Sequence, residues 1–118
     1  MIPWQRVIGG LSGGLSVAAS AYGAHGLQGK NEKYVKVFET SSRLHMIHSV
    51  MLITTPFICG QSKFAANVAG SFFTCGIALF SGPCYLVALT ENREYGKLAP
   101  LGGFSLIFGW ISLALIHK

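Results

Sequence analysis

The chain has 118 residues and a net charge of +5; 51% of its residues are hydrophobic and only 11% are charged. A soluble domain of this length usually has about 25% charged residues, so the composition argues against an ordinary soluble fold. The length indicates a single domain over residues 1–118, and the basic residues form no long block typical of nucleic-acid binding, so we expect them to face anionic phospholipid.

The first uncharged run covers residues 7–29 and predicts a transmembrane helix over residues 7–26. A helix of this run is about 35 Å long, enough to cross a hydrocarbon layer of about 30 Å. Glycines recur four residues apart, as in the pairs Gly9/Gly13 and Gly10/Gly14. Membrane helices associate by close backbone approach at small residues, so we expect other helices to pack on more than one face of this one.

Residues 30–43 form the only extended polar stretch, and Glu39 and Arg43 have the i,i+4 spacing of a helical ion pair. We predict a short amphipathic interfacial segment that runs into a second span over residues 44–60. A solvated loop is the alternative. In the interfacial segment, the side chains expected to contact lipid headgroups are Lys30, Lys33 and Lys36.

The second span contains Pro56, which should kink or end the helix because proline lacks a backbone N–H. The connection after it is very short and predicts an antiparallel hairpin with a third span over residues 64–88. Small residues occupy every fourth position of that span, including Gly70, and the Gly82-Pro83 pair should bend it.

A fourth uncharged run predicts a span over residues 99–117. The predicted fold is therefore all-α, a four-helix transmembrane bundle with a short amphipathic interfacial segment between helices 1 and 2. A soluble four-helix protein would show a polar face on every helix, and none of these runs has one. The glycines expected at helix contacts are Gly9, Gly13, Gly70, Gly102 and Gly109.

Polar side chains gather where the first helix ends and the second begins. These residues are Tyr22, His25, Glu39, Arg43, His45 and His48. The connection between the two helices returns on one side of the membrane, so we expect the three histidines at similar depth. Ionisable groups at membrane depth are candidates for proton or solute handling, or for binding a metal or haem iron. The plainer interpretation is structural hydrogen bonding, with no catalytic, cofactor-binding or metal-binding residue.

Four pieces of sequence together resemble a known family: YGAHGL at residues 22–27, RLHMIHSV at 43–50, SGPCYLVAL at 81–89, and LAPLGG at 98–103 followed by Gly109-Trp110. The family is that of transmembrane protein 256 in animals and YgdD in bacteria. The resemblance implies a multi-pass membrane protein without an established enzymatic activity and with no agreed catalytic residues. Its animal members imply a location in the mitochondrial inner membrane.

We expect a non-enzymatic accessory subunit or assembly partner of a larger mitochondrial inner-membrane complex, whose partners are other membrane subunits and lipid. The first alternative is a small proton or solute channel or carrier that uses His25, His45 and His48. The second is a cofactor-binding membrane enzyme or electron carrier. The three cysteines make neither a disulfide framework nor a zinc pattern, so no cofactor is expected from them.

Overall fold

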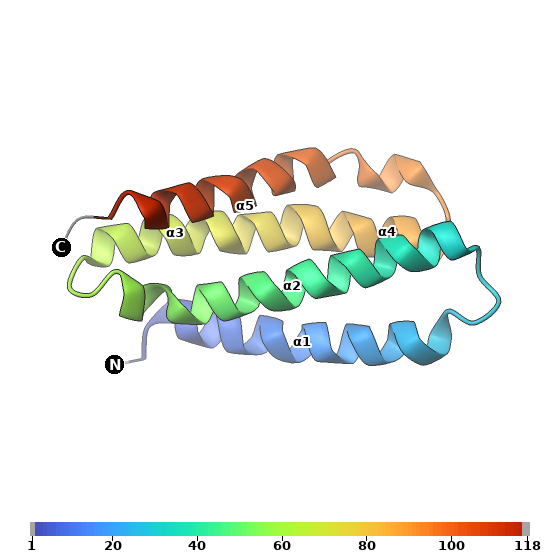
Figure 1. The fold of residues 1–118 in the computed structure, drawn as a ribbon, viewed down its shortest axis with the longest axis horizontal. Coiled ribbons are helices and arrows are strands. Elements are labelled where there is room, and N and C mark those ends of the chain that lie inside the picture. Colours follow the sequence, from blue (N-terminus) through green and yellow to red (C-terminus); the bar gives the residue numbers. More distant parts are fainter. Residues whose placement is uncertain (1, 117–118) are drawn as a thin grey trace.

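The computed structural model describes residues 2–116, and these fold into four antiparallel helical rods that form an elongated bundle of 50 × 25 × 17 Å (Figure 1). The rods are α1 (Trp4–Gly26); α2 (Glu32–Ile58); a third rod made of α3 (Lys63–Gly76), the π-helical segment η1 (Ile77–Ser81) and α4 (Gly82–Thr90); and α5 (Ala99–Ala114), which follows the short 3-10 helix η2 (Arg93–Gly96). The predicted all-α four-helix bundle is confirmed.

Helix α2 contains both the predicted interfacial segment and the predicted second span in one continuous helix of 27 residues. The side chain of Asn31 caps its start by accepting a hydrogen bond from the backbone N–H of Lys33 at 3.0 Å. Pro56 lies in the last turn, and the helix ends two residues later at Ile58. The proline therefore ends the helix and does not divide it.

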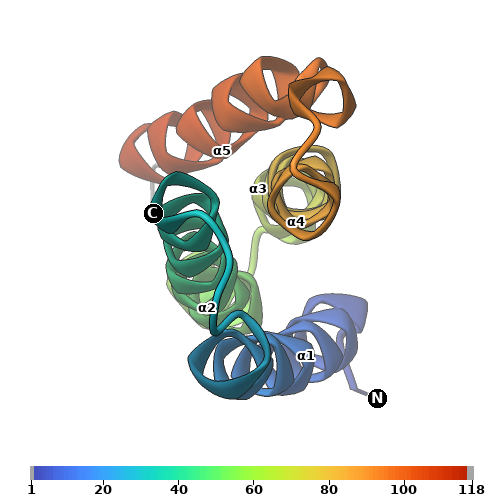
Figure 2. The same ribbon diagram turned by 90° about the vertical axis from the view of Figure 1, so that its right-hand side faces the viewer.

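The rods are arranged so that α2 and the third rod lie between α1 and α5. Figure 2 shows α1 and α5 on opposite sides of the bundle, and the contacts agree, because α1 packs chiefly against α2 and α5 against α3 and η1. The turn between α1 and α2 and the turn before α5 lie at the same end of the bundle (Figure 1). That end is the basic one, with Lys30, Lys33, Lys36, Arg93 and Lys97.

The bundle is apolar outside and partly polar inside. Three of the helical rods, over Trp4–Gly26, Lys63–Thr90 and Arg93–Ala114, are long and apolar enough to cross a membrane. Helix α2 is not among them, because it carries most of the buried polar side chains: Ser41, Ser42, His45, His48, Ser49 and Thr55. Many of the exposed side chains are large and apolar, such as Leu11, Phe57 and Phe104, as a lipid environment requires.

The third rod changes from an α-helical to a π-helical turn at η1, just before Pro83. Pro83 has no backbone N–H for the carbonyl of Leu79, so the regular ladder is interrupted there. Gly102 of α5 presses on the same place, where a methyl group would overlap the backbone of Leu79 and Phe80. The rod continues past Gly82-Pro83 as α4, and isolated π turns of this kind are frequent at functional sites.

The predicted packing glycines lie between helices, although they differ in how tightly they are packed. A Cβ atom at Gly9 would lie 2.6 Å from Ile53, one at Gly70 would lie 2.8 Å from Gln5, and one at Gly109 would lie 2.8 Å from Phe73. Gly13 is looser, with Ser49 Cβ at 3.7 Å. Two further close-packed glycines, Gly23 against Phe38 and Gly76 against Leu106, were not singled out in the sequence.

Candidate functional site

His45 joins three helices through hydrogen bonds from both ring nitrogens. Its Nδ1 lies 2.9 Å from the Tyr85 hydroxyl on α4, and its Nε2 lies 2.8 Å from Ser12 Oγ on α1. Ser12 Oγ also lies 2.7 Å from Ser49 Oγ, and Ser49 donates to the carbonyl of His45 at 2.7 Å. These four side chains form the His45 network.

The direction of every hydrogen bond in the His45 network follows from its last member. Ser49 donates its single hydrogen to a backbone carbonyl, so Ser49 Oγ accepts the hydrogen of Ser12. Ser12 then accepts from His45 Nε2–H, which leaves Nδ1 as the acceptor of the Tyr85 hydroxyl hydrogen. The imidazole is neutral in this arrangement, and each hydroxyl hydrogen in the network is donated within it.

His48, one turn further along α2, faces α3 and α5. The indole N–H of Trp110 donates to His48 Nε2 at 3.0 Å, and His48 Nδ1 lies 2.7 Å from the carbonyl of Leu44. An indole only donates and a carbonyl only accepts, so His48 is neutral and carries its proton on Nδ1. The rings of His48, Phe73 and Trp110 pack together with centroids 5.8 to 5.9 Å apart.

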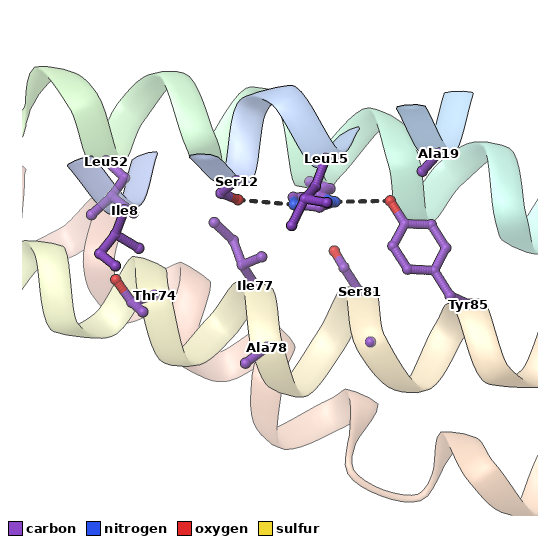
Figure 3. Close-up of a pocket in the computed structure, with 12 residues that line it drawn as sticks. Ile8, Ser12, Leu15, Ala19, Leu52, Thr74, Ile77, Ala78, Ser81 and Tyr85 are labelled. Atoms are coloured by element: carbon purple, nitrogen blue, oxygen red, sulfur yellow. Dashed lines mark hydrogen bonds between the residues drawn. The ribbon is translucent and has the colours of Figure 1, made fainter. Parts of the chain in front are cut away.

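A cavity of about 510 Å³ lies beside the His45 network, between α1 and the third rod. We call it the lateral window. Figure 3 shows Ser12 and Tyr85 converging from opposite sides on the imidazole that joins them, with Ile8, Leu15 and Ile77 around the opening. Its other lining residues are small or apolar except for two hydroxyl residues: Ala19, Leu52, Thr74, Ala78, Ser81 and Gly82.

The lateral window is closed at both ends by specific contacts. At one end, the side-chain oxygen of Asn67 on α3 accepts hydrogen bonds from Trp4 at 2.9 Å and from Gln5 at 3.0 Å. At the basic end, Leu27 packs in one buried cluster with Ala88. Beside that cluster, Lys30 Nζ donates to the carbonyl of Leu89 at 2.9 Å. Helix α1 is therefore attached to the third rod at its two ends and separated from it in the middle.

The structure keeps the three predicted histidines apart. His45 meets Ser12, and Ser12 lies thirteen positions before His25 on α1, about 20 Å along the helix. The expectation of similar depth is wrong because α2 begins at Glu32 and not near residue 44, which places His45 and His48 deep in the bundle. Across residues 2–116, no group of three or more His, Cys, Asp or Glu side chains is placed to hold a metal ion.

The other members of the predicted polar corner lie near the basic end. Tyr22 and His25 are exposed, and the Tyr22 ring lies 6.0 Å from the ring of Phe38. Glu39 and Arg43 are exposed and line one shallow hollow between α1 and α2. The predicted polar corner therefore consists of two separate regions: a surface group around Tyr22, and the buried His45 and His48.

Of the three lysines expected at lipid headgroups, Lys30 reaches the third rod as described, and Lys33 Nζ lies 5.7 Å from the centre of the Tyr34 ring. Lys36 lines a hollow between α2 and the third rod, next to Cys84. Of the cysteines, Cys59 is buried, Cys84 is half-buried and Cys75 is exposed.

Three partners of the histidines were missed: Ser12, Tyr85 and Trp110. A signal for one of them was present, because Ser12 belongs to a series of serines at every fourth position of α1, with Ser16 and Ser20. No sequence spacing connects Tyr85 or Trp110 to a histidine, since their pairing depends on how separate helices cross.

Comparison with known proteins gives a consistent match over most of the chain. A family described as "Protein of unknown function (DUF423)" matches residues 19–103. A UPF0382 membrane protein of Staphylococcus haemolyticus is 38% identical over 110 residues, which cover 92% of this chain and 90% of that protein. The UPF0382 membrane protein YwdK of Bacillus subtilis is 35% identical over 112 residues, with 92% and 91% covered. No solved structure matches the chain.

Proposed function

The chain belongs to the DUF423 family, whose similar relatives are named as membrane proteins, and from this premise we propose that it is a structural accessory subunit or assembly partner of a larger membrane complex. It is an integral membrane protein, and the names of these relatives state no enzymatic activity. The proposal is that it acts without catalysis, by packing its helices against other membrane subunits.

The observation that carries this proposal is a pair of exposed glycines on α1 that none of the other described helices contacts. Gly10 and Gly14 lie four residues apart, both are exposed, and no atom lies within 4 Å of a Cβ built on either. Gly9, one position before Gly10, is in close contact with Ile53 of α2. Small residues four apart let a second helix approach closely in a membrane, so Gly10 and Gly14 suit a helix of another subunit.

The His45 network supports a structural role over a proton path. Its hydrogen bonds begin at Tyr85 on α4, cross to Ser12 on α1, and return to the carbonyl of His45 itself. A proton path must continue toward both membrane surfaces, whereas this chain ends at a backbone acceptor on the helix from which it came. The network therefore suits a joint that fixes three helices relative to one another.

We place the proposed complex in the mitochondrial inner membrane if the chain comes from an animal, on the basis of its resemblance to transmembrane protein 256. The relatives above are bacterial, so this location rests on that resemblance alone. Fractionation of animal cells that express the tagged chain tests it: recovery in the plasma membrane or endoplasmic reticulum would contradict the mitochondrial part and leave the accessory role standing.

Native gel electrophoresis of solubilised membranes tests the accessory role. We expect the chain to migrate in an assembly far larger than its own 12.6 kDa, and Gly14→Leu to release it to the free form. The control is Ala114→Leu, an exposed small residue on α5, which should leave the assembly intact. If the unaltered chain migrates only as a free monomer or a small homo-oligomer, the accessory role is wrong.

The alternative function, a small proton or solute carrier, draws on one specific observation: the hydrogens of the His45 network are ordered in one direction from Tyr85 to Ser49. Proton flux into liposomes that contain the purified chain tests it. A carrier that uses this network should lose most of its flux in Tyr85→Phe, which removes the first hydroxyl. Equal flux in Tyr85→Phe and in the matched exposed variant Tyr95→Phe would reject the alternative.

A further inference from the structure

The lateral window is a cavity of about 510 Å³ whose ends are closed while its side is open. We propose that the lateral window holds one acyl chain of an anionic phospholipid whose phosphate group lies at Lys30. This goes beyond the accessory role and does not depend on it.

The length of the window decides between a lipid chain and a partner helix. From Ile8 to Ala19 the lining spans twelve residues of α1, about 16 Å, which is close to half of the roughly 30 Å hydrocarbon layer. A transmembrane helix needs the whole thickness. It could lie in the window only by breaking the contacts of Asn67 at one end or those of Lys30 at the other. An acyl chain from one leaflet needs no such change.

The chemistry of the floor requires an apolar occupant. The hydroxyl hydrogens of Ser12 and Tyr85 and the Nε2 hydrogen of His45 are all donated within the His45 network. Thr74 donates to the carbonyl of Gly70 at 2.7 Å. A polar solute or headgroup would therefore find no available donor on these groups and would lose its own hydration, which is costly. A hydrocarbon chain loses nothing there and gains contacts with Leu15 and Ile77.

The charge at the basic end selects the headgroup. Lys30 lies where the connection after α1 meets the end of α4, above the Ala19 end of the window. Its ammonium group has three hydrogens, and the contact with the carbonyl of Leu89 uses one of them. The other two can bind a phosphate oxygen through charge-assisted hydrogen bonds. Lys33, in the first turn of α2, adds positive charge, so an anionic headgroup is favoured over a zwitterionic one.

Native mass spectrometry of the full chain tests the proposal. The chain is purified in mild detergent and incubated with equal amounts of phosphatidylglycerol and phosphatidylcholine that carry identical acyl chains. We expect one retained phospholipid per chain, with phosphatidylglycerol preferred about fivefold, the factor that one basic residue near the headgroup contributes. Retention without any preference for phosphatidylglycerol would overturn the assignment of the headgroup to Lys30.

Variants separate the window from the rest of the apolar surface. Ala78→Phe fills the window and should reduce retention about tenfold. The control Ala21→Phe adds the same ring at an exposed position of α1 outside the window and should leave retention unchanged. Leu15→Trp fills the window from α1 and serves as the second test if Ala78→Phe does not fold. Equal retention by the window variants and the control would overturn the proposal.

Two further variants test the role of Lys30 in headgroup preference and the competing possibility that a second copy of the chain occupies the window. Lys30→Gln should keep the retained lipid but remove most of the preference for phosphatidylglycerol. Leu15→Cys, with the three natural cysteines replaced by alanine, should remain monomeric under oxidation in membranes, because the window holds lipid. Efficient disulfide-linked dimers of Leu15→Cys would place a second copy of the chain at the window and overturn the proposal.

Discussion

Trp110 donates its indole N–H to His48 Nε2 at 3.0 Å, although 62 positions separate the two residues in the chain. The bond connects the last helix to α2 and fixes the tautomer of the histidine, since Nδ1 then donates to Leu44. His45, three positions earlier, has the opposite tautomer and serves α1 and α4. Adjacent turns of α2 thus use one residue type for two different helix contacts.

The pair of Trp110 and His48 should show a measurable coupling in a double-mutant cycle. Trp110→Phe keeps an aromatic ring but leaves His48 Nε2 without its donor, and we expect a loss of about 1 kcal/mol in the free energy of unfolding from the hydrogen bond. The double variant Trp110→Phe/His48→Phe should lose less free energy of unfolding than the two single variants lose together. Unfolding in detergent, followed by circular dichroism, measures it. The pair Trp110 and His45 is the control, and a coupling as large there would contradict the assignment.

Loss of the Tyr85 hydroxyl should weaken the His45 network. Tyr85→Phe leaves His45 Nδ1 without its hydrogen-bond donor and should lower the free energy of unfolding by about 1 kcal/mol. Tyr95→Phe removes an equivalent hydroxyl from an exposed ring and should change stability by less than about 0.5 kcal/mol. Chemical unfolding of both variants in the same detergent compares them. Equal stability of the two would show that the Tyr85 hydroxyl contributes nothing.

The glycines of the bundle should respond to alanine with opposite signs. Gly102→Ala places a methyl group on the backbone of Leu79 and Phe80, and we expect a destabilisation of about 1 to 3 kcal/mol. Gly10→Ala meets nothing within 4 Å and should stabilise the isolated chain by about 0.5 kcal/mol through helix propensity. Thermal unfolding in detergent gives both values. A Gly102→Ala variant as stable as Gly10→Ala would mean that α5 does not approach η1 so closely.

Asn67 should control how firmly the start of α1 is held. Asn67→Leu removes the acceptor shared by Trp4 and Gln5, so the first turns of α1 should exchange their amide hydrogens faster. Hydrogen exchange followed by mass spectrometry reports on peptides from both ends of α1. The part near Gly23, which packs against Phe38, should be unchanged and is the internal control. Uniform acceleration along α1 would indicate general loosening of the helix instead.

The overall fold was accessible from the sequence because each rod is long and nearly free of charge. The run before Lys30 and the run after Lys63 are long enough for membrane helices, and Pro56 marks the end of α2 correctly. The small-residue pattern also indicated close helix contacts, although it did not distinguish Gly9, which is packed, from Gly10, which is not.

The site was only partly accessible, for a physical reason. The sequence marked His45 and His48 as unusual, but the charges before them suggested that the second span begins only at residue 44, which would put both histidines near the membrane surface. Helix α2 has no break there, and its charged first turns lie at the basic end of the bundle. The partners Tyr85 and Trp110 come from other helices, and only the crossing of those helices in space brings them to the histidines.

The polar side of α2 has a consequence for biosynthesis. During synthesis α2 reaches the membrane after α1, when Ser12 is already present, but before the segments that contain Tyr85 and Trp110 have been made. An unpaired polar group in hydrocarbon costs several kcal/mol, so α2 in the nascent chain is an unfavourable occupant of the bilayer. We therefore expect the last helix to complete the membrane integration of the second.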